Sequence, residues 1–360
     1  MTNNLSQFNT INNKINLLSF NYVQMCNFFL SIGEKKYCAD QIMYWIYQKY
    51  CNDFNKMTNL SILLRNKLNN ICIISAPKFI EEVKSIDGTI KWKVIVNKNF
   101  IETVFIPERN RSTLCISSQI GCPLKCTFCA TGQQKFKGNL NVEHIIGQIW
   151  TVCKILNYNN VSKIRPITNI VMMGMGEPLL NLKNVINALE IMVDNFCFNF
   201  SKHKITLSTS GIIPALDKLK NSIDVNLAIS LHAPNNFIRN QLMSINKKYN
   251  IQNLLCAVKR YLKKSKIKQK RVTIEYVMLD HINDEICHAE ELASILKDIP
   301  SKINLIPWNI FPNSKYKTSN MIRIKRFSDI LINKGFLTII RKNRGIDINA
   351  ACGQLVGRFV

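Results

Sequence analysis

Apolar residues recur every three or four positions through the first part of the chain. Between residues 17 and 68 this spacing includes Val23, Cys26 and Phe29. It is the spacing of helices that bury one face. The sequence therefore predicts a small N-terminal helical accessory domain over residues 1–80.

The pattern then changes to one in which every second residue is apolar. Residues 89–96 and 100–106 alternate in this way on either side of a short polar turn. Two alternating runs around such a turn are typical of a β-hairpin. We expect a hairpin linker over residues 81–107.

Beyond residue 107, short β-rich apolar runs alternate with amphipathic stretches. The predicted strands span residues 113–117, 169–173, 204–208, 225–230, 271–278, 303–306 and 336–341. The predicted helices span residues 142–156, 182–195, 251–264, 284–297 and 321–333. This alternation is typical of parallel βαβ units, which bind ligands at the carboxyl ends of their strands. The sequence predicts an α/β core over residues 108–347, as a barrel or an open sheet, and a C-terminal segment over residues 348–360.

The composition excludes a disordered or fibrous chain, because 47% of the 360 residues are hydrophobic. There are 48 basic and 23 acidic residues, which give a formal net charge of +25. Such an excess favours a polyanionic partner, with nucleic acid first. Eight basic residues fall within positions 259–271, where they either face water or follow phosphates. Arg341, Lys342 and Arg344 precede the C-terminal segment, and we expect them near RNA.

Neither a membrane span nor a secretory signal is evident. The longest apolar runs are far shorter than the roughly 18 residues that a bilayer requires, and the polar first residues do not resemble a signal peptide. We therefore expect a cytoplasmic protein that does not contact membrane. Thirteen cysteines are many for a reducing compartment, so some of the thiols need a role other than structural disulfides.

Three of these thiols lie within eight residues. Cys122, Cys126 and Cys129 follow the first predicted strand of the core, and clustered thiolates select iron-sulfur clusters, zinc or copper. A zinc site wants four ligands and would need a further residue such as Cys115. Three thiolates on a four-iron cube would instead leave one iron open to a small molecule.

The C-x3-C-x2-C spacing after a core strand resembles the radical S-adenosylmethionine (SAM) superfamily. This resemblance implies a partial (β/α) barrel and one [4Fe-4S] cluster held by Cys122, Cys126 and Cys129. It also implies that the open iron binds SAM, from which a 5′-deoxyadenosyl radical is released. The protein would position and shield this chemistry.

Polar residues follow several other predicted strands, where glycines let the backbone approach a ligand and side chains can bind it. Each alone would more often be an ordinary turn or a helix cap. Beside the cysteine loop, the resemblance makes them the expected SAM pocket: Gly176, Glu177, Ser208, Ser230, Leu231, His232 and Asn309.

A narrower resemblance covers residues 14–354. The segments that carry it are 102–107, 113–122, 174–179, 230–233, 303–309 and 350–355. Together they closely resemble the family of dual-specificity adenine C2-methyltransferases, which act on 23S rRNA and tRNA.

This family resemblance implies roles for two further thiols and a carboxylate. Cys352 is methylated by one SAM, and the radical from a second SAM activates that methyl group for addition to adenine C2. Glu102 matches the general base that removes the C2 proton. Cys115 then attacks the sulfur of Cys352, which releases the product and leaves a transient disulfide. Two SAM molecules are used per turnover.

Further expectations follow from the same resemblance. The N-terminal domain would grip folded RNA, the target adenine would leave its stack, and a flavodoxin-like donor would reduce the cluster of a monomeric enzyme. Two alternatives stay open. One is the related enzyme type that methylates adenine C8 in 23S rRNA. The other is a zinc-stabilised RNA-binding protein without catalysis.

Overall fold

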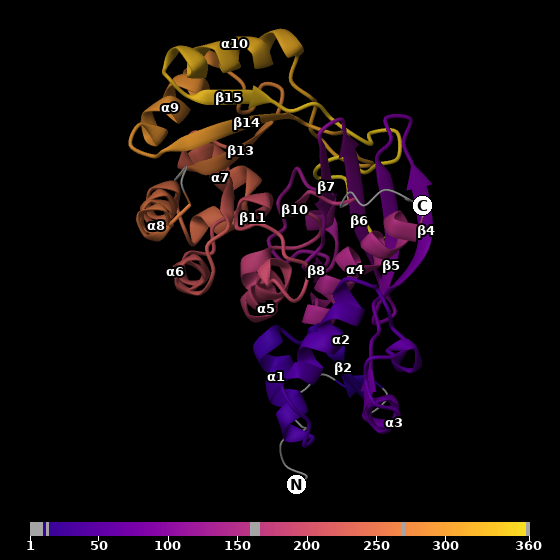
Figure 1. Cartoon of the computed structure of the whole chain (residues 1–360). Helices are drawn as coiled ribbons and strands as arrows, with labels where there is room; N and C mark the ends of the chain where they lie inside the picture. The colour runs from indigo at the N-terminus through magenta and orange to yellow at the C-terminus, as the bar shows by residue number, and fades with distance from the viewer. Residues whose placement is uncertain (1–9, 12–13, 159–165, 268–270, 358–360) are drawn as a thin grey trace. The chain divides into compact units, whose positions relative to one another are not determined.

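The computed structural model describes residues 10–11, 14–158, 166–267 and 271–357 (Figure 1). The chain forms two compact units. Unit 1 comprises Met1–Lys78, Leu140–Thr168 and Lys183–Ser201, and unit 2 comprises Phe79–Asn139, Asn169–Leu182 and Lys202–Val360. None of the described helices combines the length and the apolar character that a membrane span needs.

Unit 1 is mainly helical, as the sequence predicts. Its elements are α1 (Tyr22–Ser31), α2 (Tyr37–Tyr47), α3 (Ile62–Ile71), α4 (Val142–Tyr158), α5 (Leu182–Val193) beyond its first residue, β1 (Thr10–Ile11), β2 (Lys14–Asn16), β3 (Cys72–Ile73), η2 (Leu17–Ser19) and η3 (Phe54–Lys56). α1 begins with a capping box in which the Asn21 side chain accepts from the backbone N–H of Gln24. Its buried face runs through Met25, Cys26, Phe28 and Phe29, whereas Val23 is 65% exposed.

Two helices predicted for the α/β core belong to this unit. The Trp150 indole of α4 donates to the carbonyl of Ile46 at 2.7 Å. Four residues after α5, the backbone carbonyl of Cys197 accepts from the Gln48 side-chain amide at 2.9 Å. Both contacts join the later helices to α2 and the residue after it. The helices themselves are where the pattern places them, but sequence order does not show that they pack with the N-terminal segment.

Unit 2 is built on a ten-stranded sheet, in the order β15-β14-β13-β12-β11-β10-β7-β6-β5-β4. The parallel strands are β7 (Arg111–Cys115), β10 (Asn169–Met172), β11 (Ile205–Thr209), β12 (Asn226–Ser230), β13 (Val272–Met278), β14 (Ser301–Pro307) and β15 (Leu337–Ile340). The sheet ends in β15 and β4 and is therefore an open, partial barrel. Six of the seven residues of β13 are buried, as expected for a parallel strand with both faces covered.

The helices of this unit follow the strands. They are α6 (Ile213–Ser222), α7 (Asn236–Leu242), α8 (Ile251–Lys264), α9 (Ile286–Leu296) and α10 (Met321–Asn333), with η4 (Thr131–Gln133), η5 (Pro178–Asn181), η6 (Lys202–Lys204) and η7 (Ser244–Lys247). Figure 1 shows α8, α9 and α10 outside the curve of strands β13 to β15. α6 and α7 were not predicted, because ten and seven residues give too few turns for a clear period.

The predicted hairpin is present and continues the main sheet. β5 (Ile90–Val96) pairs antiparallel with β6 (Asn99–Glu108), and β6 pairs antiparallel with β7. β4 (Lys78–Lys84) forms the sheet edge beyond β5. A separate two-stranded sheet joins β8 (Gln119–Ile120) to β9 (Gly138–Asn139). The segment expected as a linker therefore forms one side of unit 2.

Candidate active site

The three clustered cysteines occupy one loop of unit 2, between β8 and η4. Trp308, just after β14, donates its indole N–H to the carbonyl of Phe128 at 2.9 Å. The Thr127 N–H donates to the carbonyl of Leu242 at 3.0 Å. At Gly132, a Cβ atom would lie 2.6 Å from the carbonyl oxygen of Cys126, so this tight fold requires glycine. Tethers to the ends of α7 and β14 therefore fix the loop on the strand ends.

The three thiols lie within electrostatic range of one another. Burial raises the pKa of Cys122 to about 12, and the charge of Cys129 adds to this shift. Burial and the charges of the other two thiolates raise the pKa of Cys126 well above its ordinary value. Holding all three as thiolates therefore requires a bound cation, which lowers thiol pKa values.

The arrangement favours an iron-sulfur cube over zinc. The loop brings together three thiols, those of Cys122, Cys126 and Cys129, and burial raises the pKa of each. A structural zinc site draws four ligands around one ion, whereas a four-iron cube takes each thiolate at a separate corner. Cys122, Cys126 and Cys129 therefore fit a [4Fe-4S] cluster.

Glu177 lies at the end of β10 and joins it to the end of β11. Its buried carboxylate accepts from the Thr209 hydroxyl at 2.7 Å, from the Ser210 N–H at 2.8 Å and from the Leu179 N–H at 3.1 Å. Burial raises the pKa of this carboxyl, and the hydrogen bonds oppose the shift. A carboxylate has about four acceptor positions, so three partners leave about one position for an ammonium group. At Gly176, with φ +99°, a Cβ atom would lie 2.4 Å from the Cβ atom of Gln119, so this close packing requires glycine.

The serines of the expected SAM pocket stand side by side. The hydroxyls of Ser208 on β11 and Ser230 on β12 are 3.4 Å apart, because neighbouring parallel strands end at the same edge. Leu231 is fully buried, and its backbone N–H donates to the carbonyl of Glu275 at 3.1 Å. The structure thus brings these strand ends together, as the sequence predicts.

His232 follows β12 with a left-handed backbone, φ +58°. Its ring packs edge-on against Phe128 of the cysteine loop, with centroids 4.8 Å apart. Burial lowers the imidazole pKa to about 3, and the nearby Arg239 cation adds to the shift. The neutral ring accepts from the Val277 N–H through Nδ1 at 3.1 Å. His232 therefore supports the cysteine loop as an uncharged side chain.

Arg239, on the unpredicted helix α7, is a buried cation that sequence reasoning missed. Its guanidinium donates to the carbonyls of Ser210 at 2.8 Å, Ser230 at 3.2 Å and Leu231 at 3.1 Å. Burial lowers its pKa to about 10, which still leaves it charged at neutral pH. One side chain thereby fixes the ends of two strands. A lone arginine in a short helix gives no sequence signal of this role.

The C-terminal segment lies against the cysteine loop. Ala130 N–H donates to the Gly353 carbonyl at 2.7 Å, and the Thr131 hydroxyl donates to the Leu355 carbonyl at 2.7 Å. The amide of Asn309 donates to the carbonyl of Cys352 at 3.2 Å. Asn309, expected as a SAM contact, therefore also holds the segment that carries Cys352.

Cys115 and Cys352 lie within electrostatic range of one another, although they are 237 positions apart in the sequence. Desolvation raises the pKa of Cys115 to about 12, the Cys352 thiolate adds to the rise, and the Arg341 cation opposes it. Surrounding protein raises the pKa of Cys352 to about 11, again opposed by Arg341. Cys352 is exposed to solvent, so a substrate can reach its sulfur atom. Arg341 lies 3.7 Å from the buried carboxylate of Glu275.

Glu102 is a buried carboxylate on β6, where it holds two partners. Lys91 on β5 lies 3.2 Å from its Oε1 atom. Its Oε2 atom accepts from the backbone N–H of Val356 at 2.8 Å. The C-terminal segment therefore reaches both the cysteine loop and Glu102. The family resemblance pointed to Glu102 as a candidate, but not to its link with Val356.

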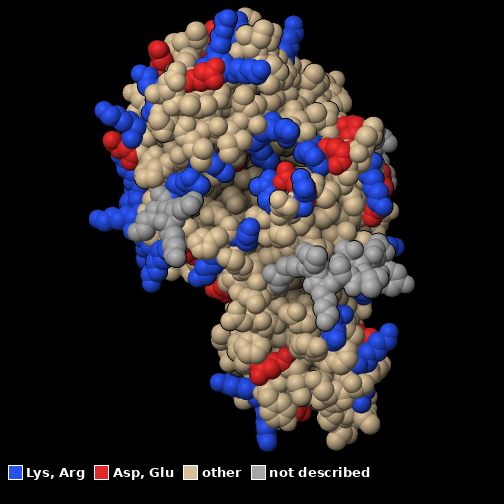
Figure 2. Space-filling view, turned by 45° about the horizontal axis from the view of Figure 1, so that its top comes forward, with Lys and Arg blue, Asp and Glu red and all other residues tan. Residues whose placement is uncertain are grey.

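Several of the basic residues expected near RNA instead contact other parts of the protein. Lys259 and Arg260 pair with Asp298 and Asp217, which favours a solvated helix face for this part of the basic run; residues 268–270 lie outside the described chain. Arg344, expected near RNA, donates to the carbonyls of Asp87 and Pro107 and therefore has a structural role. Figure 2 shows other Lys and Arg side chains spread over one face of the molecule.

A three-cysteine loop at the strand ends of a partial barrel defines a radical SAM enzyme. Residues 116–293 match the model of the Radical SAM superfamily. Residues 15–74 match the model described as the ribosomal RNA large subunit methyltransferase N-terminal domain. The core and the N-terminal domain thus each match a family model.

Two relatives narrow this class. The dual-specificity RNA methyltransferase RlmN of Buchnera aphidicola subsp. Baizongia pistaciae (strain Bp) is 60% identical over 344 residues, which are 96% of this chain and 92% of the relative. A crystal structure of a radical SAM methyltransferase from Sphaerobacter thermophilus, 36% identical, matches with a TM-score of 0.88 over 95% of this chain and 99% of that one. The chain belongs to the RlmN family of radical SAM methyltransferases. The fold, the [4Fe-4S] cluster and the SAM cofactor expected from the sequence are therefore confirmed.

Proposed function

We propose that this enzyme methylates C2 of a specific adenine in 23S rRNA and in tRNA. RNA methylation by a radical SAM enzyme is the activity of the family, and the relative from Buchnera is named for dual specificity. The observation that carries the proposal is the position of Cys352. It lies on a segment tied to the cysteine loop by Ala130 and Thr131, and its thiolate lies within electrostatic range of Cys115.

The carbon to be methylated explains the need for a protein thiol. Adenine C2 lies between two ring nitrogens and is electron-poor, so it does not displace a methyl group from SAM. A thiolate does, and we assign Cys352 to accept the methyl group first. When bound, the cluster and SAM supply the radical chemistry that activates this methyl group, with two SAM molecules per turnover.

The remaining steps need a base and a second thiol. Glu102 is buried and oriented by Lys91 and the Val356 N–H, which supports its assignment as the group that takes the C2 proton. Cys115 then attacks the sulfur of Cys352. The bond from the Cys352 sulfur to the carbon attached to the base breaks, that carbon takes up a proton to become the methyl group, and a Cys115–Cys352 disulfide forms that must be reduced before the next cycle. The single electron that radical addition leaves on the base would be taken up by the cluster, when bound.

We assign binding of the cluster to Cys122, Cys126 and Cys129. SAM binding is assigned to the backbone around Gly176, the hydroxyls of Ser208 and Ser230, the backbone of Leu231, and the side chains of Glu177, His232 and Asn309. For Glu177 and His232 the existing hydrogen bonds support a role in shaping the pocket. The flavodoxin-like reductant, the monomeric state and the cytoplasmic location remain predictions.

The test is product analysis after anaerobic reaction. The full chain is reconstituted with iron and sulfide, and transcripts of 23S rRNA and tRNA are treated with SAM and a reductant. Digestion and mass spectrometry should find 2-methyladenosine in both RNAs. Finding 8-methyladenosine alone would support the C8 alternative and reject the proposal. A colourless protein with one tightly held zinc ion would support the non-catalytic alternative.

A further inference from the structure

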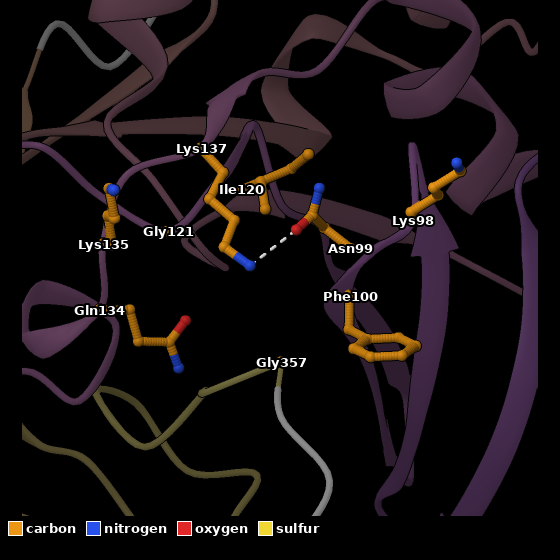
Figure 3. A pocket seen from close by; sticks show the side chains of 9 residues that line it. All are labelled: Lys98, Asn99, Phe100, Ile120, Gly121, Gln134, Lys135, Lys137 and Gly357. Atoms are coloured by element: carbon orange, nitrogen blue, oxygen red, sulfur yellow. Dashed lines mark hydrogen bonds between the residues drawn. The ribbon is translucent and has the colours of Figure 1, made fainter.

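A cavity of about 270 Å³ opens in unit 2, between the tip of the β5–β6 hairpin and the loop that follows the three cysteines (Figure 3). Its walls include Lys98, Asn99 and Phe100 from the hairpin, and Lys135 and Lys137 from the loop. None of its lining residues is acidic. The described residues around the cavity therefore bring three positive charges close to one aromatic ring.

Two of the three lysines have no partner among the described residues. Lys137 donates to the side chain of Asn99 at 2.8 Å. Lys98 and Lys135 are exposed and form no hydrogen bond or ion pair within the described chain. In Figure 3 they lie on opposite sides of the Lys137–Asn99 pair. Two free ammonium groups around an aromatic wall suit a nucleotide, with phosphate on the lysines and a base stacked on the ring.

The position of Lys98 is sterically costly. Asn97 and Lys98 form the two-residue turn between β5 and β6, with left-handed φ angles of +48° and +60°. Turns of this type prefer glycine at the second position, because other side chains are strained there. The chain instead places a lysine at that position, at the edge of the cavity.

The cavity adjoins the candidate active site along one strand. Phe100 and Glu102 lie two residues apart on β6, and therefore on the same face and about 7 Å apart. Two successive residues of the C-terminal segment contact the active site and the cavity in turn. The Val356 N–H donates to the Glu102 carboxylate. At Gly357 a Cβ atom would lie 2.5 Å from the Phe100 carbonyl. If the target base reaches Glu102, its neighbour in the RNA strand reaches Phe100.

We propose that this cavity binds the nucleotide next to the target adenine, with its base on Phe100 and its backbone phosphate between Lys98 and Lys135. The inference rests on the proposed function and adds a substrate-positioning subsite to it. The subsite holds the strand beside Glu102 while the target base is out of its stack. Phosphate contacts position the strand, and stacking tolerates any base.

The experiment measures RNA binding without turnover. Reconstituted full-length enzyme and SAM are mixed, without reductant, with a fluorescent tRNA transcript, and anisotropy is followed at several salt concentrations. The variant Lys98→Gly with Lys135→Ala removes two charges. The pair Lys325→Ala with Lys334→Ala, on and just after α10, removes two exposed charges far along the chain and is the control. Because glycine relieves the turn, Lys98→Gly alone should melt no lower than wild type.

We expect the cavity variant to bind about tenfold more weakly, with a salt dependence less steep by roughly 1.4 to 1.8 in log–log slope. The control pair should keep the wild-type affinity and slope. Equal effects of the two pairs would overturn the proposal.

Stacking is tested separately with Phe100→Leu. Loss of the ring should weaken binding by roughly 5- to 150-fold. Two further RNAs each lack the base of one nucleotide next to the mapped target, one on the 5′ side and one on the 3′ side. For one of these two RNAs, Phe100→Leu should weaken binding little. An unchanged penalty on both abasic RNAs would show that Phe100 stacks on no neighbouring base. Wild-type enzyme that makes no 2-methyladenosine would instead reject the proposed function, so the two failures are distinguishable.

Discussion

The most informative perturbation is Cys115→Ala, because it removes only the thiol assigned to product release. Methylation of Cys352 and addition to the base need no thiol at position 115. The RNA should therefore become covalently attached through Cys352 and remain attached. Each active enzyme should yield about one adduct, without a second turnover.

The surroundings of Cys115 also determine how strongly product release by the wild type should depend on pH. Desolvation and the Cys352 charge raise the pKa of Cys115 to about 12. At pH 8 a thiol with that pKa is about one part in 10⁴ thiolate, whereas an ordinary thiol is roughly a quarter ionised. Thiolate is the attacking species. Release by the wild type should thus rise about tenfold per pH unit from pH 7 towards the pKa, as far as release limits turnover.

One cause of this shift disappears in the adduct itself. Once the Cys352 sulfur carries the base, it bears no negative charge, while the Arg341 cation still opposes the rise. The pKa of Cys115 should then be lower than in the free enzyme. The Cys115 thiol would therefore ionise more easily in the adduct, which is the stage where its thiolate is needed.

The assay uses end-labelled tRNA, anaerobic enzyme, SAM and reductant, followed by denaturing electrophoresis. Cys115→Ala should give a protein-linked RNA band that protease removes, and the band should be independent of pH. Cys256→Ala, which removes an exposed thiol on α8, is the control and should turn over as the wild type does. Free, unmodified RNA alone, or normal turnover by Cys115→Ala, would refute the reasoning.

Three further predictions concern the supporting residues. Cys126→Ser should lose iron, sulfide and SAM cleavage on anaerobic analysis while keeping its far-ultraviolet circular dichroism; retained SAM cleavage would contradict the cluster assignment. Glu102→Gln keeps an acceptor for the Val356 N–H but cannot take a proton, so RNA methylation should fall about 10²- to 10⁴-fold while SAM cleavage continues, and a loss below threefold would exclude it as the base. Arg239→Met leaves several buried carbonyls unpaired and should destabilise unit 2 by about 3 to 5 kcal/mol, measured by urea unfolding against the exposed Arg326→Met. Equal stability of these two variants would contradict the role of Arg239.

The sequence alone determined the local structure and the nature of the chemistry. Strand and helix periods gave the parallel core, since buried strands and amphipathic helices repeat at their own spacing. The spacing of Cys122, Cys126 and Cys129 requires only one loop, so it is readable without a fold. Residues after the strands were expected to converge, because parallel strands end at one edge. Ser208 and Ser230 do so.

Only the tertiary structure decided the long-range contacts. It placed α4 and α5 with the N-terminal helices, brought the Val356 N–H to Glu102, and set Arg239 beneath two strand ends. Such contacts join residues far apart in the chain through single hydrogen bonds, which leave no periodic pattern. The cavity at Phe100 arises in the same way, from a hairpin turn and a distant loop that meet only after folding.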